Sequence, residues 1–185
     1  VARGAADATS VPSRPSCLPA ASPDLPSTVD DLLIDVSVQP IDGAGGILCG
    51  GYGRDSWDIW VLRLTADGEL DPSWGSGGVT WVDPGSGAAY LRDLRLDGDG
   101  RAVLAGSYPT IGQVLLARLD VAGGLDATFG GDGIVSHDLA ADAMDTAEEL
   151  RILPDGRLLV AGTIDRQLPT RDDLLLARLE DDGSL

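Results

Sequence analysis

An acidic, glycine-rich loop is the first place in this chain where chemistry could be expected. Residues 96–108 are LDGDGRAVLAGSY, and closely spaced carboxylates can bind calcium. An EF-hand loop that starts at Asp97 would need a third acid where Arg101 stands and a glutamate where Tyr108 stands. The later stretch GGDGIVSHD, residues 130–138, has the glycines of an RTX repeat but valine where that repeat needs aspartate. Neither segment predicts a metal site, and we expect no cofactor.

The residues that usually perform nucleophilic or acid–base catalysis are scarce. His137 is the only histidine, and the only cysteines are Cys17 and Cys49. With His137 as the single histidine, we do not expect a Ser/His/Asp or Cys/His set. The cysteines match no zinc or haem-attachment spacing, and a disulfide between them is left open. We therefore expect a protein that is not an enzyme, with paired carboxylates as in glycoside hydrolysis as the catalytic alternative.

Internal repetition decides how the chain is organised. One half-unit occurs three times, with Cys49, Ala105 and Ala161 aligned at a spacing of 56 residues. Its copies are GGILCGGY at 45–52, GRAVLAGSY at 100–108 and GRLLVAGTI at 156–164. A second half-unit alternates with the first and contains the aligned arginines Arg63, Arg118 and Arg178. The predicted organisation is an Ala/Ser/Pro-rich extended tail at 1–29, followed by a repeat domain at 30–185 with units at about 30–84, 85–140 and 141–185.

Each unit offers four candidate strands, which in the second unit lie at about 89–96, 101–107, 114–120 and 133–138. The middle two are nearly continuous apolar runs, which indicates strands that are covered on both faces. The pair Asp99-Gly100 is typical of a two-residue hairpin turn, so it explains the acidic loop without a metal. A four-stranded antiparallel sheet that repeats at this length is typical of a propeller blade. We predict an all-β, β-propeller-like array of about three four-stranded antiparallel blades, the last one incomplete.

Two stretches of the chain resemble the delta-60 repeat. They are ARLDVAGGLDATFGGDGIV at 117–135 and LRILPDGRLLVAGT at 150–163. This bacterial family is found in proteins expected to be secreted or surface-bound, and it is taken to form β-propellers. The resemblance implies a propeller fold over about 30–185 and a secreted, cell-surface or periplasmic location, but no active site. Trp74 stands where the repeat has phenylalanine, and the last unit stops at Leu185, before its expected Asp-x-x-Phe-Gly.

Three blades are too few to close a ring, since propellers typically have about four to eight. Further blades of a longer protein could complete the ring, and so could other copies of the chain. A larger assembly could also cover the open ends. The break inside the last unit favours the first explanation.

The charge of the chain limits its partners. Thirty acidic residues against 13 basic ones give a net charge of −17. This argues against nucleic-acid binding, because phosphates would be repelled. No apolar run is long enough for a transmembrane helix. We expect protein partners or assembly neighbours, and predict a non-catalytic binding or scaffold module. A structural subunit of a larger multi-protein assembly is the alternative, and a propeller-type hydrolase the lesser one.

Two sets of residues are candidates for specific roles. The repeated arginines lie within apolar strands and need carboxylate partners, for which Asp71 and Asp126 are candidates. Trp74 and Phe129 are expected to fill the interfaces between blades. Contacts with ligands or partners are expected in the loops that join second and third strands, since these loops differ among the units. The candidate contact residues are Tyr52, Arg54, Trp57, Tyr108, Gln113, Arg166 and Arg171.

Overall fold

The computed structural model describes residues 31–32, 39–41, 46–53, 58–85, 87–141, 143–166 and 172–185. These residues form strands and turns, and none of them belongs to a helix that could cross a membrane. The strands are β1 Asp31–Leu32, β2 Gln39–Ile41, β3 Gly46–Gly53, β4 Ile59–Leu64, β5 Val79–Val82, β6 Tyr90–Leu96, β7 Ala102–Tyr108, β8 Gln113–Leu119, β9 Ile134–His137, β10 Met144–Ile152, β11 Leu158–Asp165 and β12 Asp172–Leu179.

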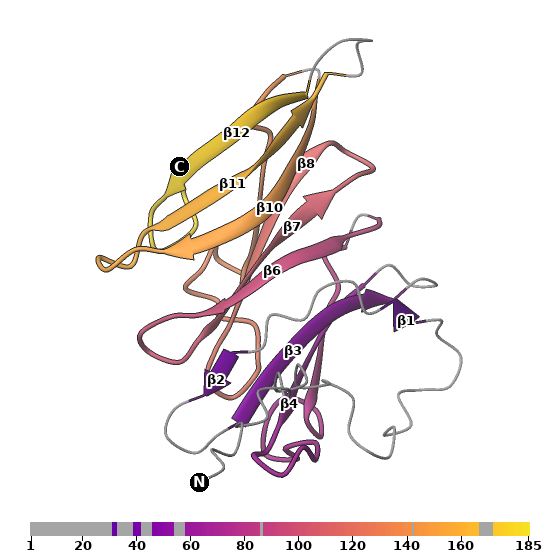
Figure 1. Ribbon diagram of the computed structural model, residues 1–185, viewed down its shortest axis with the longest axis vertical. Helices are drawn as coiled ribbons and strands as arrows, with labels where there is room; N and C mark the ends of the chain where they lie inside the picture. The colour runs from indigo at the N-terminus through magenta and orange to yellow at the C-terminus, as the bar shows by residue number, and fades with distance from the viewer. Residues whose placement is uncertain are drawn as a thin grey trace, which may run out of the picture.

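The strands form three antiparallel sheets, which we call blades 1, 2 and 3. Blade 2 has the order β6–β7–β8–β9, and blade 3 has the order β10–β11–β12. Blade 1 has the order β3–β4–β5, with β1 and β2 both paired to the edge of β3 that faces away from β4. The sheets follow one another along the chain, neighbouring faces are packed together, and the array is not closed (Figure 1).

The predicted all-β fold of repeated antiparallel blades is confirmed. In blade 2 the strand predicted at 89–96 is β6, Tyr90–Leu96, and the strand predicted at 133–138 is β9, Ile134–His137. All residues of β7 are buried, as are all but the first of β8. Continuous apolar runs form these two strands because neighbouring blades cover both faces of the sheet.

The acidic loop is a tight hairpin turn, with one difference from the expected geometry. The backbone N–H of Asp97 donates to the carbonyl oxygen of Arg101 at 2.9 Å, and that of Gly100 donates to the carbonyl of Asp97 at 3.2 Å. Gly100 has a φ of +81°. The hydrogen bonds enclose three residues, which corresponds to a type I turn followed by a glycine in the left-handed region, rather than the two-residue turn expected for Asp99-Gly100.

The alignment of Cys49 with Ala105 is wrong by one residue. In blade 1, Leu48 lies opposite Arg63, whereas in blade 2 the residue opposite Arg118 is Val103. Relative to the arginines, it is therefore the residue after Cys49 that matches Ala105. Because successive side chains alternate between the faces of a sheet, this shift moves Cys49 to the opposite face.

Two apolar clusters hold the blades together. The first joins blades 1 and 2 and includes Ile59, Val61, Leu94, Leu104 and Leu115. The second joins blades 2 and 3 and includes Val103, Leu116, Leu150, Val160 and Leu175. Each blade thus uses a different face for each neighbour, and blade 2 is covered on both sides.

Candidate functional site

Each interface between blades is closed by an aromatic ring beneath a glycine turn. Trp74 of blade 1 lies under Gly123 of blade 2, where a Cβ atom would come within 2.7 Å of the ring. Phe129 of blade 2 lies under Gly183 of blade 3, where a Cβ would also come within 2.7 Å. Both rings are buried, at 2% and 0% exposure. The aromatic residues therefore lie at the interfaces between blades, and the neighbouring blade supplies the glycine that makes room for each ring.

Arg118 binds groups of both blades at the second interface. It is 4% exposed, and its Nε donates to Oδ2 of Asp126 at 2.8 Å. Its Nη2 donates to Oγ1 of Thr128 at 2.8 Å, and its Nη1 donates to the carbonyl of Asp181 in blade 3 at 2.6 Å. The guanidinium also lies 4.9 Å from the centre of the Phe129 ring. A single arginine thus fixes the corner of its own blade and binds the next blade.

The corresponding arginine and aspartate of blade 1, Arg63 and Asp71, are arranged in the same way. Nε of Arg63 lies 3.0 Å from Oδ2 of Asp71. The other oxygen of Asp71 accepts hydrogen bonds from the N–H and hydroxyl of Ser73, at 3.0 Å and 2.5 Å. In blade 3, Arg178 is exposed, and no carboxylate among the described residues pairs with it. Two of the three repeated arginines therefore pair with the expected aspartates, Arg63 with Asp71 and Arg118 with Asp126.

Hydrogen bonds from Thr128 lower the pKa of Asp126. Its hydroxyl donates to Oδ1 of Asp126 at 2.7 Å, and its N–H donates to the same oxygen at 3.0 Å. The hydroxyl bond lowers the pKa of Asp126 below its usual 3.8, as do the backbone bond and Arg118, while burial opposes them.

Replacing Thr128 with valine is expected to raise the pKa of Asp126 toward 3.8. A depressed pKa in the folded state stabilises the protein above the unfolded-state value, and this contribution is lost as the pH falls through the folded-state pKa. The variant should therefore be less stable than the parent at pH 7, and the difference should vanish in strong acid. Carbon-13 NMR titration of the carboxyl group and urea unfolding measure the two effects. Thr163→Val, an exposed change in β11, is the control, and an unchanged pKa in the Thr128 variant would contradict the assignment.

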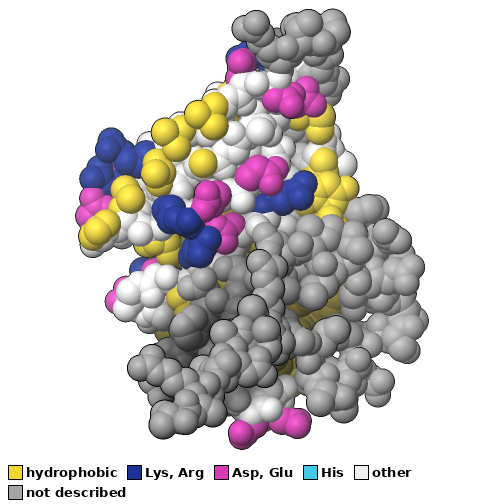
Figure 2. Space-filling view, in the orientation of Figure 1, with side chains coloured by type: hydrophobic (Ala, Val, Ile, Leu, Met, Phe, Trp, Pro, Cys, Tyr) yellow, Lys and Arg dark blue, Asp and Glu magenta, His cyan; other side chains and the backbone are white. Residues whose placement is uncertain are grey.

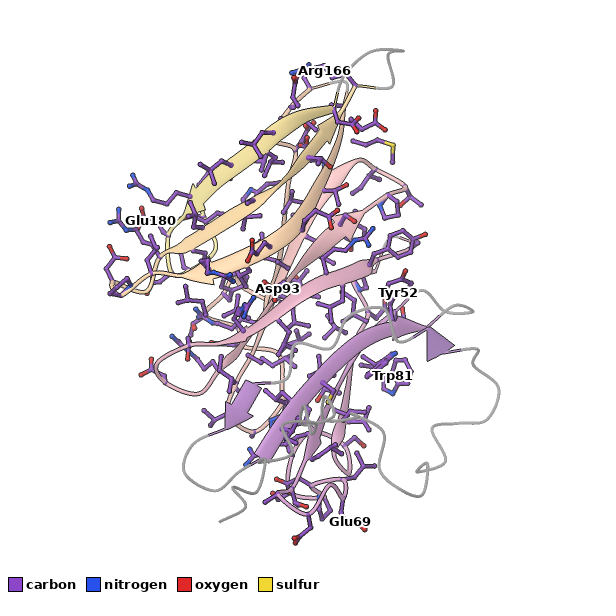
Figure 3. The ribbon with its side chains drawn as sticks, in the orientation of Figure 1. Tyr52, Glu69, Trp81, Asp93, Arg166 and Glu180 are labelled. Atoms are coloured by element: carbon purple, nitrogen blue, oxygen red, sulfur yellow. The ribbon has the colours of Figure 1, made fainter. Side chains whose placement is uncertain are left out.

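A buried aspartate links the first strands of blades 2 and 3. Asp93 follows an irregularity in the pairing of β6 with β7 and is 7% exposed. Its Oδ2 accepts a hydrogen bond from the backbone N–H of Leu150 in β10 at 2.9 Å, and also pairs with Arg95. Figure 3 shows Asp93 between β6 and β10. The sequence does not single out this residue, because the bulge that turns it toward the next blade has no distinctive residue type.

Arg101 pairs with both carboxylates of the acidic loop. Its Nε lies 2.6 Å from Oδ2 of Asp97, and its Nη2 lies 3.2 Å from Oδ2 of Asp99. These side chains line a cavity of about 350 Å³ between blades 2 and 3, walled on the apolar side by Leu96 and Leu158. In the part of the chain that the structure describes, no group of three or more His, Cys, Asp or Glu side chains is placed to hold a metal ion.

The expected contact residues fall into three groups. Tyr52 and Tyr108 lie within β3 and β7 rather than in loops, and they are buried at 6% and 3% exposure. Both strands extend further toward the hairpin loop than expected, so the two tyrosine side chains are part of the sheets and are buried. Gln113 begins β8 and is half-buried, while Arg166 is exposed and pairs with Asp173 at 3.2 Å. The other three expected contact residues, which lie outside the described part of the chain, are Arg54, Trp57 and Arg171.

Cys49 and His137 also have definite positions. Cys49 is fully buried in β3 and is not a free thiol. Cys17 and the 1–29 tail lie outside the described residues, so the Cys17–Cys49 pairing stays a prediction. Nε2 of His137 lies 2.8 Å from the carbonyl oxygen of Gly183. The histidine therefore contacts the backbone of the neighbouring blade.

The most exposed apolar surface of the described residues lies on blade 3. Leu159, Ala161 and Thr163 of β11 lie opposite Arg178, Leu176 and Leu174 of β12, so their side chains share one face. Glu149 of β10 lies opposite Ala161 and joins the same face. We call this set of seven residues the outer face of blade 3. Figure 2 shows hydrophobic side chains gathered where Figure 1 draws β11 and β12.

The outer face is similar in composition to a face that is buried in blade 2. Leu174 and Leu176 are 79% and 65% exposed, whereas the residues at the same positions of β8, Val114 and Leu116, are 1% and 0% exposed. The difference arises because blade 3 covers blade 2, while no described blade covers blade 3. The outer face is therefore similar to a buried blade face but is exposed among the described residues.

Comparison with known proteins gives the same architecture. A family model described as "Domain of unknown function (DUF5122) beta-propeller" matches residues 45–73 and 153–185. The first segment spans β3, β4 and the Asp71 turn, and the second spans β11, β12 and the turn at Gly183. No curated protein matches the chain. The matched segments and the three antiparallel sheets together support a β-propeller-like repeat family.

Proposed function

We propose that this chain is a non-catalytic scaffold or binding module, built from delta-60-type repeats, that contacts a protein partner through the outer face of blade 3. We further propose that it works in a secreted, cell-surface or periplasmic setting. The resemblance of the repeats supports the location. The exposure of Leu174 and Leu176, at positions that are buried in blade 2, carries the proposal of a contact.

The partner that best fits the outer face is another blade of the same kind. Blade 2 is covered on the equivalent face by Leu150, Leu158, Val160 and Leu175 of blade 3. A partner with a similar leucine- and valine-rich sheet would bury the outer face in the same way. Burial of apolar area is the main source of stability in such contacts.

Two polar groups of the outer face are also placed to bind a blade. Arg178 is equivalent to Arg118, which donates to the carbonyl of Asp181 in the following blade. Glu149 is equivalent to Asp93, which accepts from the backbone N–H of Leu150 in the following blade. Both bonds use backbone groups of the partner, so they select for a strand and a turn at fixed positions rather than for particular side chains.

The test is an in-phase extension of the chain. A second copy of residues 126–185, joined after Leu185, supplies the turn and fourth strand of blade 3 and then a fourth blade, because Leu185 is equivalent to Leu125. Amide exchange at Leu174 and Leu176 should be at least about tenfold slower in this chain than in a chain extended by residues 126–140 alone, which supplies the fourth strand without the fourth blade. The control is the longer extension with Leu174→Asp and Leu176→Asp in blade 3, which should return exchange to the rate of the shorter extension. Equal exchange in the two extended chains would contradict the proposal.

A further inference from the structure

The face of blade 1 that points away from blade 2 is buried, although none of the described blades covers it. Alternate residues of β3 and β4 that lie opposite one another form this rear face, namely Ile47, Cys49, Trp60, Leu62 and Leu64. Cys49 is fully buried, and Trp60 is 3% exposed. The residues between them in the strands, such as Val61, pack against blade 2 instead.

The apolar cluster on the rear face differs from the other two clusters in its members. Each of the other clusters joins residues of two blades. This cluster contains residues of blade 1 alone, with Leu70 and Val79 packed against it. One face of a sheet cannot bury itself, because its side chains stand next to one another and need a second layer above them. The burial of the rear face therefore requires a layer that the described blades do not supply.

In blades 2 and 3 the equivalent face packs against the preceding blade. Counted from the repeated arginines, Cys49 is equivalent to Leu104 of blade 2 and to Val160 of blade 3. Leu104 belongs to the cluster that joins blades 1 and 2, and Val160 belongs to the cluster that joins blades 2 and 3. The rear face of blade 1 is therefore the place where a repeat array receives its preceding blade.

The rear face is bulkier than the faces that receive a blade. Trp60 stands where the other blades have leucine, and Leu62 stands where they have alanine. The residues at these positions are Leu115 and Ala117 in blade 2, and Leu175 and Ala177 in blade 3. The ring of Trp60 lies over Gly51, where a Cβ atom would come within 2.4 Å of it. A blade at the usual distance would be overpacked against these larger side chains, so the rear face fits a thinner layer.

Cys49 offers a covalent anchor at the centre of the rear face. It is not a free thiol, and Cys17 is the only other cysteine of the chain. Residues 1–29, around Cys17, contain two arginines and two aspartates, whose charges cancel, whereas the whole chain has a net charge of −17. Prolines, which lack the N–H that an interior strand donates, recur in this segment at Pro12, Pro15, Pro19, Pro23 and Pro26. The segment is therefore suited to cover an apolar face and unsuited to form a blade.

We infer that residues 1–29 form an N-terminal cap, which covers the rear face of blade 1 and is held there by a disulfide between Cys17 and Cys49. The cap takes the place of a preceding blade, so this face does not bind a blade of the same array or of another copy. Repeat arrays need such caps because a terminal unit would otherwise expose its apolar face to water. The inference is independent of the contact proposed for blade 3, which lies at the opposite end of the array (Figure 1).

The disulfide requires an oxidant. Two thiols lose two protons and two electrons as the S–S bond forms, and a small disulfide such as oxidised glutathione accepts them and leaves as two thiols. Disulfides form and persist in oxidising compartments. The cap is therefore suited to the secreted, cell-surface or periplasmic setting proposed above.

The indole N–H of Trp60 reports on the cap. It is buried and has no hydrogen-bond partner among the described residues, so its protection from exchange depends on the layer above it. Two other tryptophans serve as references within the chain, since Trp74 is buried between blades 1 and 2 and Trp81 is 38% exposed. In the oxidised full chain, Trp60 should exchange at least about tenfold more slowly than Trp81, measured by NMR.

A specific protease site inserted after Val29 allows the cap to be removed. After cleavage without a reductant, the mass of the protein should still include residues 1–29, and Trp60 should stay protected. A reductant should then release the segment and speed exchange at Trp60 at least about tenfold, while exchange at Trp74 stays unchanged.

A peptide of residues 1–29, added back under oxidising conditions, should restore slow exchange at Trp60. The control peptide has the same composition and keeps cysteine at position 17, but its other residues are in scrambled order. It can form the disulfide and should not restore protection. Restoration by the native peptide alone supports the cap, even where release of the segment also loosens blade 1. Release of the segment without a reductant, unchanged exchange at Trp60 after release, or equal effects of the two peptides overturns the inference.

Discussion

Replacing Arg118 with alanine is expected to lower the free energy of unfolding by about 3–5 kcal/mol. The side chain is buried, and its removal takes away the Nε donor to Oδ2 of Asp126 and the Nη1 donor to the carbonyl of Asp181. Loss of the contact with the Phe129 ring adds to the cost. For a protein of this length, the melting temperature should fall by roughly 10 °C, measured by calorimetry or thermal circular dichroism.

The chain contains its own control for this prediction. Arg178 occupies the equivalent position in blade 3 but is exposed, so Arg178→Ala should change stability by less than about 0.5 kcal/mol. Arg118→Lys should fall between the two alanine variants, because a lysine keeps the charge but cannot reach three acceptors with a rigid fork. Equal effects of the two alanine variants would show that the contacts of Arg118 do not stabilise the fold.

Replacing Gly123 with alanine is the second change with a large expected effect. Gly123 has a φ of +90°, and a Cβ atom there would lie 2.7 Å from the Trp74 ring and 2.8 Å from the backbone nitrogen of Gly75. A methyl group in such a place costs about 1–3 kcal/mol through overpacking, in addition to about 1–2 kcal/mol for the left-handed backbone. Urea unfolding should show the sum of the two costs.

Gly68 separates these two contributions. It lies in the equivalent turn of blade 1 with a φ of +81°, but no atom lies within 4 Å of the place that a Cβ would take. Gly68→Ala should therefore show only the backbone cost, about 1–2 kcal/mol. If Gly68→Ala and Gly123→Ala lower the free energy of unfolding equally, the close approach of Gly123 to Trp74 does not contribute to the effect.

The positions of the strands follow from the sequence because their causes are local. An apolar run bounded by aspartate and glycine forms a strand between two turns, whatever surrounds it. The register of Cys49 does not follow, because it depends on which residue Arg63 faces across the hairpin. Tyr52 and Tyr108 likewise look like loop residues in a sequence, but the strands extend far enough to bury them.

The exposed character of the outer face could not be predicted from its residues. Leu174 and Leu176 resemble Val114 and Leu116 in type and spacing, yet one pair is exposed and the other buried. Burial in a repeat array depends on the neighbouring unit and not on the strand itself. The sequence can therefore show that a strand face is apolar enough to be buried. Only the arrangement of the blades shows which of these faces is exposed.

The placement of Trp74 under Gly123, and of Phe129 under Gly183, has a consequence for how such an array can be cut or lengthened. The ring belongs to one blade and its cover to the next, so a complete packing unit begins inside one sheet and ends inside the following one. A duplication or deletion that keeps whole packing units must have both endpoints at the same point of the repeat. If the endpoints differed, an aromatic side chain would lose the glycine turn that packs on it, or a glycine turn would have no aromatic side chain beneath it.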